Sequence, residues 1–449
     1  MSDISENKMG TMPVNRLLVS MSVPIMISML IQALYNIVDS MYVAKISEEA
    51  LTAVSIAFPY QNLMIAVGTG TGVGVNALLS KRLGQKNFEE VSRTANISIF
   101  LALMSGLAFA ILGFTVVRPF LSLQTNNQKI IELGTSYLQI VSVVSVGLFG
   151  QICLERLLQS TGKTIFSMIT QGLGALVNII LDPIMIFGCG PIPSMGIAGA
   201  AYATVIAQLI AAATGMILNL KVNKEIKFSF KGMLPQGKII KKIYSVGIPS
   251  ILMGSIGSVM TFTMNKILVG FTETAVAVFG VYFKLQSFIF MPVFGLNNGL
   301  VPILAYNLGA KKIDRMKKAR FLGLIYATSF MLVGFILFQL FPKTLLGMFD
   351  ASKDMLAIGI PALRTISYHF LLAGFSIITI SMFQAVGNGL YSLYVSVARQ
   401  LVVLIPAAFL LSLTGNLNAI WLSFPIAEVG SVIACLLLSK KILLTKSRH

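Results

Sequence analysis

The amino-acid sequence predicts an all-α integral membrane protein with twelve transmembrane helices in two pseudo-symmetric lobes of six. Three observations predict this fold class. Apolar residues make up 56% of the chain and charged residues only 11%. Apolar stretches long enough to cross a bilayer recur along the chain, and segments of its first half return in its second half. A soluble fold of 449 residues cannot bury so much apolar surface, whereas a bilayer can solvate it.

The helices follow from the lengths of the apolar stretches. An α-helix rises about 1.5 Å per residue, so it crosses a ~30 Å hydrocarbon core in about 20 residues. Twelve stretches reach that length, near 14–43, 51–80, 94–117, 131–154, 164–188, 196–219, 240–268, 275–305, 320–341, 357–383, 393–413 and 417–439.

The basic residues set the expected orientation. The net charge of +18 would suggest nucleic acid in a soluble protein, but these residues are confined to certain loops, so we expect no nucleic-acid partner. Cytoplasmic loops are rich in Lys and Arg. Both termini are therefore expected in the cytoplasm, in a multi-pass protein of the cell membrane whose first helix directs insertion. The basic groups on that side are Arg16, Lys81 to Arg93, Lys163, Lys221 to Lys242, Lys311 to Arg320 and Lys440 to Arg448.

An internal repeat organises the chain. LLSKRLGQKNFEEV (78–91) aligns with ILAYNLGAKKIDRM (303–316) at an offset of 225 residues, and the same offset pairs Pro24 with Pro249 and QSTGKTIFS (159–167) with QAVGNGLYS (384–392). We therefore divide the chain into an N-lobe (1–220), a cytoplasmic linker (221–240) and a C-lobe (241–449). Two lobes with the same orientation, related by an axis along the membrane normal, favour a central cavity and alternating access.

Ionisable groups deep in a membrane are costly and mark functional sites. Asp39 and Asp182 lie at similar depth in the outer half of the N-lobe, and Asn36 and Asn178 each share a helical face with one of them. Two such carboxylates close together cannot easily both stay charged. We therefore expect an ion-coupling site, which holds a proton or a small cation. Packing between helices is the alternative role of each acid.

Three other polar residues lie within predicted spans. Glu428 is in the last helix, and the repeat makes Gln208 its counterpart in the first half. Lys284 is a cation within a span, which could also extend toward the outer surface. All three are candidate substrate-binding residues, with packing as the alternative for Glu428.

Met and aromatic side chains suit bulky, apolar or cationic ligands. The run YFKLQSFIFMPVF (282–294) therefore supplies Phe290, Met291 and Phe294 as further binding candidates, and Tyr35 lies one turn before Asp39. Pro24 removes a backbone hydrogen bond inside the first helix, so we expect a kink and a hinge there.

These residues resemble the MATE (multidrug and toxic compound extrusion) family, in its bacterial multidrug branch. The matching segments are ALYNIVDSMYVA (33–44), ALTAVSIAFP (50–59), LLSKRLGQ (78–85), QSTGKT (159–164), NIILDPIMIFG (178–188) and GIAGAAYAT (196–204). The resemblance implies a MATE-like fold, in which twelve helices form two V-shaped lobes, and antiport of organic cations against protons or sodium. It also implies that Asp39, Asn178, Asp182 and Thr204 form an acidic N-lobe site.

The resemblance also bears on the coupling ion. Another branch of the family binds sodium through acids in helices seven and ten. Here those helices read PSILMGSIGSV and SYHFLLAGFSIITIS, without an acid. The resemblance therefore favours N-lobe coupling, with the proton as the ion, and no metal site or other cofactor is expected.

Other functions fit the sequence less well. A lipid-linked precursor flippase of related architecture would need several cations in its cavity, and Lys284 is the only one predicted there. An intramembrane enzyme would need a metal motif such as DDxxD or a nucleophile with a base, and an ATP-driven pump would need a phosphate loop. The sequence shows none of these. We expect a transporter, not an enzyme, a receptor or a channel, which exports small organic molecules and works as a monomer.

Overall fold

The computed structural model describes residues 6–349 and 351–446. Within these residues, ten helices are long and apolar enough to cross a membrane, and twelve if each of two bent pairs counts as one span. The N-lobe spans are α2 (Val14–Ala44), α3 (Glu48–Gly84), α4 (Phe88–Thr115), the bent pair α6 (Gln128–Val143) with α7 (Val146–Ser160), α8 (Thr164–Phe187) and α9 (Gly196–Val222).

The C-lobe repeats this order. Its spans are α10 (Gly237–Val269), α11 (Glu273–Gly309), α12 (Ile313–Leu340), the bent pair α14 (Lys353–Ser367) with α15 (Phe370–Ala385), a broken helix made of α16 (Gly389–Val397), the π-helix η2 (Ala398–Leu404) and α17 (Ile405–Ser412), and α19 (Ser423–Lys446) after the short α18 (Leu417–Ile420). The fold therefore confirms twelve transmembrane helices in two lobes.

Short helices complete the chain. They are α1 (Lys8–Thr11) before the first span, α5 (Val117–Ser122) and α13 (Pro342–Gly347) at corresponding places in the two lobes, and the 3₁₀ turn η1 (Phe230–Met233) in the linker. Both bent pairs turn by 48°. Each had been expected as one continuous helix, because neither break contains a proline or a glycine: they fall at Val144–Ser145 and at Tyr368–His369.

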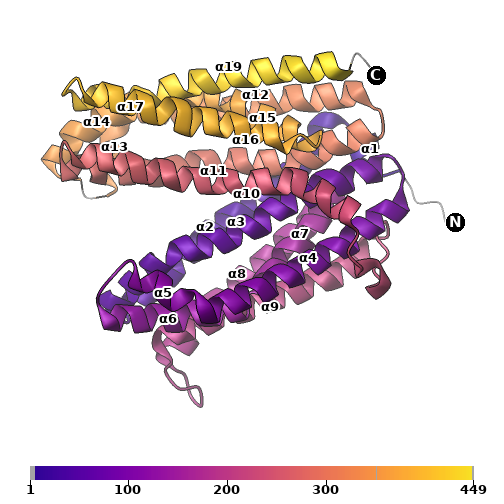
Figure 1. Ribbon diagram of the computed structural model, residues 1–449, viewed down its shortest axis with the longest axis horizontal. Coiled ribbons are helices and arrows are strands. Elements are labelled where there is room, and N and C mark those ends of the chain that lie inside the picture. The colour runs from indigo at the N-terminus through magenta and orange to yellow at the C-terminus, as the bar shows by residue number, and fades with distance from the viewer. Residues whose placement is uncertain (1–5, 350, 447–449) are drawn as a thin grey trace.

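The two lobes diverge from a common end, so the molecule has the shape of a V (Figure 1). Both chain ends and α1 lie at the end where the lobes meet, which we call the closed end, whereas α5 and α6 lie far from α13 and α14 at the open end. Between the lobes, α3 packs on α10 and α11 packs on α2 and α3. The two lobes therefore diverge away from the chain ends.

A reciprocal helix crossing closes the V. A Cβ on Gly84 would overlap the Tyr306 carbonyl oxygen, and a Cβ on Gly309 would overlap the Lys81 carbonyl oxygen. Both the two glycines and the two carbonyl residues are separated by the repeat offset. The repeat found in the sequence is thus a two-fold contact in space, where absent side chains let α3 and α11 touch through their backbones.

Replacing Gly84 by alanine should destabilise the protein by about 1–3 kcal/mol, since the added methyl group must displace the Tyr306 backbone. The matched control is Gly280→Ala on α11, because a Cβ there would meet no atom within 4 Å. Thermal unfolding of the purified variants measures the difference. Equal melting temperatures for the two variants would contradict the close crossing.

Candidate functional site

The acids of the N-lobe lie on two neighbouring helices. Asp39 is near the open end of α2 and Asp182 near the open end of α8, and these helices pack along each other. Asp182 is completely buried and Asp39 partly buried. The predicted similarity of depth is therefore what brings the two side chains together.

The two carboxyl groups lie close enough for each to affect the charge of the other. Oδ1 of Asp39 and Oδ2 of Asp182 are buried, and neither has a donor among the described residues. An ionised carboxylate only accepts hydrogen bonds, so two of them can be bonded to each other only if one carries a proton. A proton between the two carboxyl groups would satisfy both buried oxygens.

Amide and hydroxyl groups extend this acidic pair. The Asn178 side chain donates both to Asp182 Oδ1 and to Thr204 Oγ1 of α9, each at 3.4 Å. Asn178, Asp182 and Thr204 therefore form one cluster with Asp39. Asn36 is different: its side chain is exposed and has no hydrogen-bond partner in the described part of the chain.

Two tyrosines stand near the acids. The charges of Asp39 and Asp182 act on the hydroxyls of both Tyr35 and Tyr137, and Gln61 Nε2 donates to the Tyr137 hydroxyl at 3.1 Å. Tyr35 had been singled out in the sequence, but Tyr137 and Gln61 had not, because neither residue lies within one of the recognised motifs. The structure thus adds a hydroxyl and an amide to the surroundings of the acid pair.

Pro24 lies in α2 on the closed-end side of the acid. Its missing N–H leaves the Ser20 carbonyl without its usual helical donor, and Thr164 Oγ1 at the start of α8 donates to that oxygen at 3.1 Å. The chain of α2 continues as one helix through Pro24. The proline therefore ties α2 to α8 at one end, while the acid pair joins them at the other, and the hinge stays a prediction.

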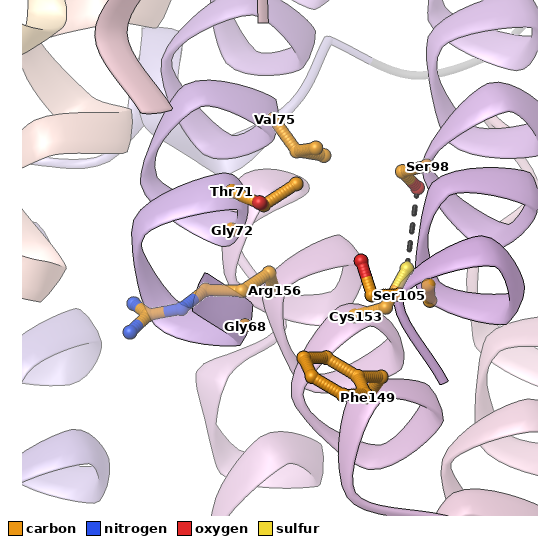
Figure 2. Close-up of a pocket in the computed structure, with 10 residues that line it drawn as sticks. Gly68, Thr71, Gly72, Val75, Ser98, Ser105, Phe149, Cys153 and Arg156 are labelled. Carbon is orange, nitrogen blue, oxygen red and sulfur yellow. Dashed lines mark hydrogen bonds between the residues drawn. The ribbon is translucent and has the colours of Figure 1, made fainter. Parts of the chain in front are cut away.

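A polar network connects the N-lobe interior to the other lobe. Gln151 Nε2 donates to Glu155 and to Gln171, both at 3.0 Å. Arg156, which follows Glu155 in the sequence, donates to Asn298 of α11 at 3.3 Å. Figure 2 shows that its guanidinium points away from the small cavity between α3, α4 and α7, which Cys153 and Phe149 line. That cavity, at about 20 Å³, has room for a water molecule but not for a drug.

The C-lobe holds a larger cavity of about 260 Å³. Three of the predicted binding residues line it: Phe290, Phe294 and Glu428. Two further wall residues that can carry a positive charge, His369 and Arg399, were not predicted. The signal was present, because both lie within apolar spans, but their pairing with Glu428 depends on the bent and π-helical segments.

Three binding candidates lie elsewhere. Met291 directly follows the cavity-lining Phe290 in the sequence but does not itself line the cavity. The Lys284 side chain is exposed and its ammonium lies 5.8 Å from the centre of the Phe349 ring, away from the cavity. Gln208 packs beside Gly147, with a buried Oε1 that has no donor among the described residues.

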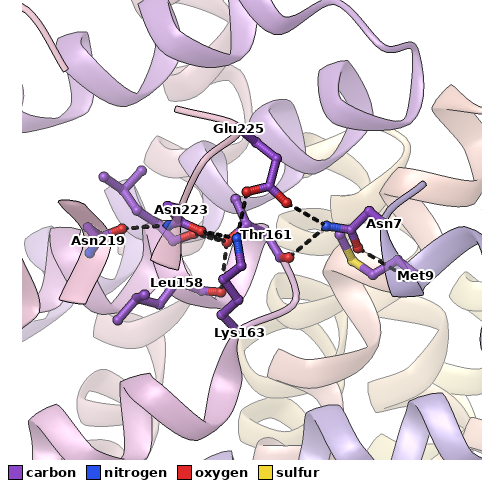
Figure 3. A network of polar contacts seen from close by, with 9 residues as sticks. Asn7, Met9, Leu158, Thr161, Lys163, Asn219, Asn223 and Glu225 are labelled. Atoms are coloured by element: carbon purple, nitrogen blue, oxygen red, sulfur yellow. Dashed lines mark hydrogen bonds and ion pairs between the residues drawn. The ribbon is translucent and has the colours of Figure 1, made fainter. Parts of the chain in front are cut away.

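The segment before α2 ties the closed end together (Figure 3). Asn7 donates to the Thr161 carbonyl at 2.9 Å and to Glu225 at 3.2 Å, and Glu225 forms an ion pair with Lys163 at 2.5 Å. On the other lobe, Lys312 forms an ion pair with Glu6. That contact lowers the pKa of the Glu6 carboxyl. One segment therefore contacts both lobes where they meet.

Comparisons with known proteins agree over nearly the whole chain. The family model described as MatE matches twice, at residues 24–184 and 249–410, and the two matches start one repeat offset apart. The FAD transporter of Shewanella oneidensis is 26% identical over 440 residues, with 96% of this chain and 95% of that protein covered. The multidrug export protein MepA of Staphylococcus haemolyticus is 28% identical, with 91% and 89% covered.

Solved structures share the fold. A MATE crystallised in complex with MaL6 has a TM-score of 0.90 and 25% identity, and covers 98% of this chain and 99% of its own. A multidrug resistance MATE family transporter in an outward-facing conformation has a TM-score of 0.91 and 24% identity, with both chains fully covered.

Replacing Thr164 by valine should destabilise the protein by about 1–3 kcal/mol, because the partly buried Ser20 carbonyl would lose its donor. Thr115→Val is the control, since that exposed hydroxyl bonds only within its own helix. Thermal unfolding compares the two. The link between α2 and α8 would be refuted if both variants unfolded at the wild-type temperature.

Proposed function

Because the chain belongs to the MATE family, we propose that its export of organic compounds is driven by protons bound at Asp39 and Asp182. The chain is a secondary-active multidrug exporter with twelve helices in two lobes. The identity of the coupling ion, the site residues and the orientation in the membrane are the parts that we propose.

One observation carries the choice of the proton. Asp39 and Asp182 face each other with acceptor oxygens that have no donor, and a proton between them satisfies both groups. The low dielectric of the interior makes two adjacent negative charges costly. With one proton the pair carries a single negative charge. Loss of that proton leaves two negative charges, which repel each other and push α2 and α8 apart.

The same geometry supports a coupling mechanism. Protonation draws α2 onto α8 at the open end, and deprotonation pushes the two helices apart there. Because α2 also packs on α11 of the other lobe, a change in its position alters the wall of the central space. Drug and proton would thereby favour different positions of one element, which antiport requires.

The substrates we propose are bulky, apolar and often cationic compounds. The lining of the C-lobe cavity includes aromatic and Met side chains, Met253 and Met260 among them, which suit such ligands. The relatives named as multidrug export proteins support this class. We propose that the protein works as a single chain.

The charge pattern supports an outward-facing state. The closed end carries Lys163, Lys312 and Arg315, and loops rich in Lys and Arg stay in the cytoplasm. With the closed end in the cytoplasm, both chain ends are cytoplasmic and the space between the lobes opens to the outside.

Asp39→Asn and Asp182→Asn should each abolish efflux of ethidium driven by a pH gradient in proteoliposomes, because a neutral amide cannot release the proton. Glu132→Gln, at an exposed acid of α6, is the control and should transport as the wild type does. Full transport by the Asp39→Asn, Asp182→Asn double variant would refute the assignment of these acids as the coupling site. Efflux that follows an imposed sodium gradient but not a pH gradient would support the site and show that sodium is the coupling ion.

Thiol labelling tests the orientation. Cys189 is exposed in the loop that follows α8 at the open end, whereas Cys153 and Cys435 are buried. A membrane-impermeant maleimide should label Cys189 from outside intact cells. In a Cys189→Ser background, Phe230→Cys in the linker, where Phe230 is 90% exposed, should react only after permeabilisation. The reverse labelling pattern would show that the closed end lies outside the cell, which would contradict the proposed orientation.

A further inference from the structure

The cavity inside the C-lobe is separate from the acid pair of the N-lobe and holds a charged cluster of its own. Its wall combines aromatic rings with side-chain amides, including Phe283, Phe290, Phe424, Gln286, Gln384 and Gln400. At about 260 Å³ it is slightly smaller than the ligand pockets of about 300–1,000 Å³ that proteins usually have, so it suits an aromatic ring system at the small end of that range.

Charges from three elements meet in this wall. Glu428 of α19 is 1% exposed, and its Oε2 lies 3.5 Å from Nη1 of Arg399 and 3.7 Å from Nδ1 of His369. The Nε2 of His369 lies 3.0 Å from the Tyr282 hydroxyl of α11. Charged groups buried in a membrane are costly, and they mark substrate or ion pathways.

Both partners of Glu428 are placed by irregular backbone. Arg399 lies in the π-helix Ala398–Leu404, and His369 lies at the 48° break between α14 and α15. Short π-helical turns inside α-helices occur frequently at functional sites. Two irregular helical segments therefore place polar side chains in the same cavity, which indicates a binding site.

Arg399 has unused binding capacity. A guanidinium carries five N–H donors, and the only partner of this one in the described chain is Glu428 at 3.5 Å, well beyond the 2.7–2.9 Å typical of charge-assisted bonds. Its side chain is 25% exposed and lines the cavity. The guanidinium can therefore accept a second anionic group from the cavity side.

We propose that the C-lobe cavity is a second substrate site, which takes aromatic zwitterions and binds their carboxylate at Arg399. The cluster of Arg399 and Glu428 is neutral as a whole, and burying a net charge at low dielectric is unfavourable. A ligand that is itself neutral overall but carries both signs meets this condition. Its carboxylate pairs with Arg399, and its delocalised cation lies among the aromatic rings of Phe283 and Phe290, where cation–π attraction favours it.

This proposal rests on the export function and not on the identity of the coupling ion. It adds to the class of bulky cations a class that shares their rings but carries a carboxylate. Two rhodamines give a matched pair of probes: one with a free carboxylate, which is a zwitterion, and its methyl ester, which is a cation with the same rings.

The test is equilibrium binding of both dyes to purified protein, followed by fluorescence polarisation. Arg399→Gln should weaken binding of the zwitterion about tenfold or more, as expected for loss of a hydrogen-bonded charge pair, and leave the ester within about twofold. Arg118→Gln, at an exposed arginine of α5, is the control and should change neither affinity. The site is refuted if Arg399→Gln weakens the binding of both dyes equally, or if the zwitterion binds to that variant with wild-type affinity.

Removing Arg399 alone leaves a buried Glu428 without its counter-ion, which could destabilise the lobe. The double variant Arg399→Gln, Glu428→Gln removes both charges and should show the same selective loss of the zwitterion. Asp39→Asn separates this proposal from the coupling mechanism, because it should stop efflux of both dyes while the zwitterion still binds. If Asp39→Asn weakened zwitterion binding as much as Arg399→Gln does, the two sites would not be distinct and the proposal would fall.

Discussion

Two carboxyl groups that face each other inside one lobe impose the main constraint on this molecule. Asp39 and Asp182 come from helices that pack side by side, and no other described group donates to their inner oxygens. Their contact is therefore attractive with a proton and repulsive without one. In the mechanism we propose, the position of α2 relative to α8 depends on that single proton at the open end and on the bond from Thr164 to Ser20 at the other.

In the mechanism we propose, the contacts between the lobes convert a change in protonation of the acid pair into a change in the space between the lobes. The lobes touch through backbone at Gly84 and Gly309, where no side chain separates α3 from α11. The segment around Asn7 and Glu6 contacts both lobes at the same end. With the closed end in the cytoplasm, as we propose, opening on that side would have to break these contacts. In the proposed mechanism the proton acts on α2, which packs on α11, and so changes the space between the lobes.

Much of this could be predicted from the sequence, because apolar length and repetition survive any detail of packing. The spans, the repeat and the clustering of Asp182 with Asn178 and Thr204 follow from spacing and from the resemblance. The two bent helices could not be predicted, since their breaks contain neither proline nor glycine. The partners of Glu428 were missed for the same reason: His369 lies at one of those breaks and Arg399 in a π-helix, and regular helical counting places neither of them. Asn36 shares a face with Asp39 by counting, yet the curvature and packing of α2 leave it exposed.

Proton release on drug binding is the measurement that tests the shared proton most directly. Purified protein in weakly buffered detergent, with a pH-sensitive dye, is titrated with ethidium while the change in acidity is followed. We expect the wild type to release protons as the drug binds, and the Asp39→Asn, Asp182→Asn double variant to bind ethidium without releasing any. Equal proton release from the double variant, or none from the wild type, would contradict a drug-coupled proton at this acid pair.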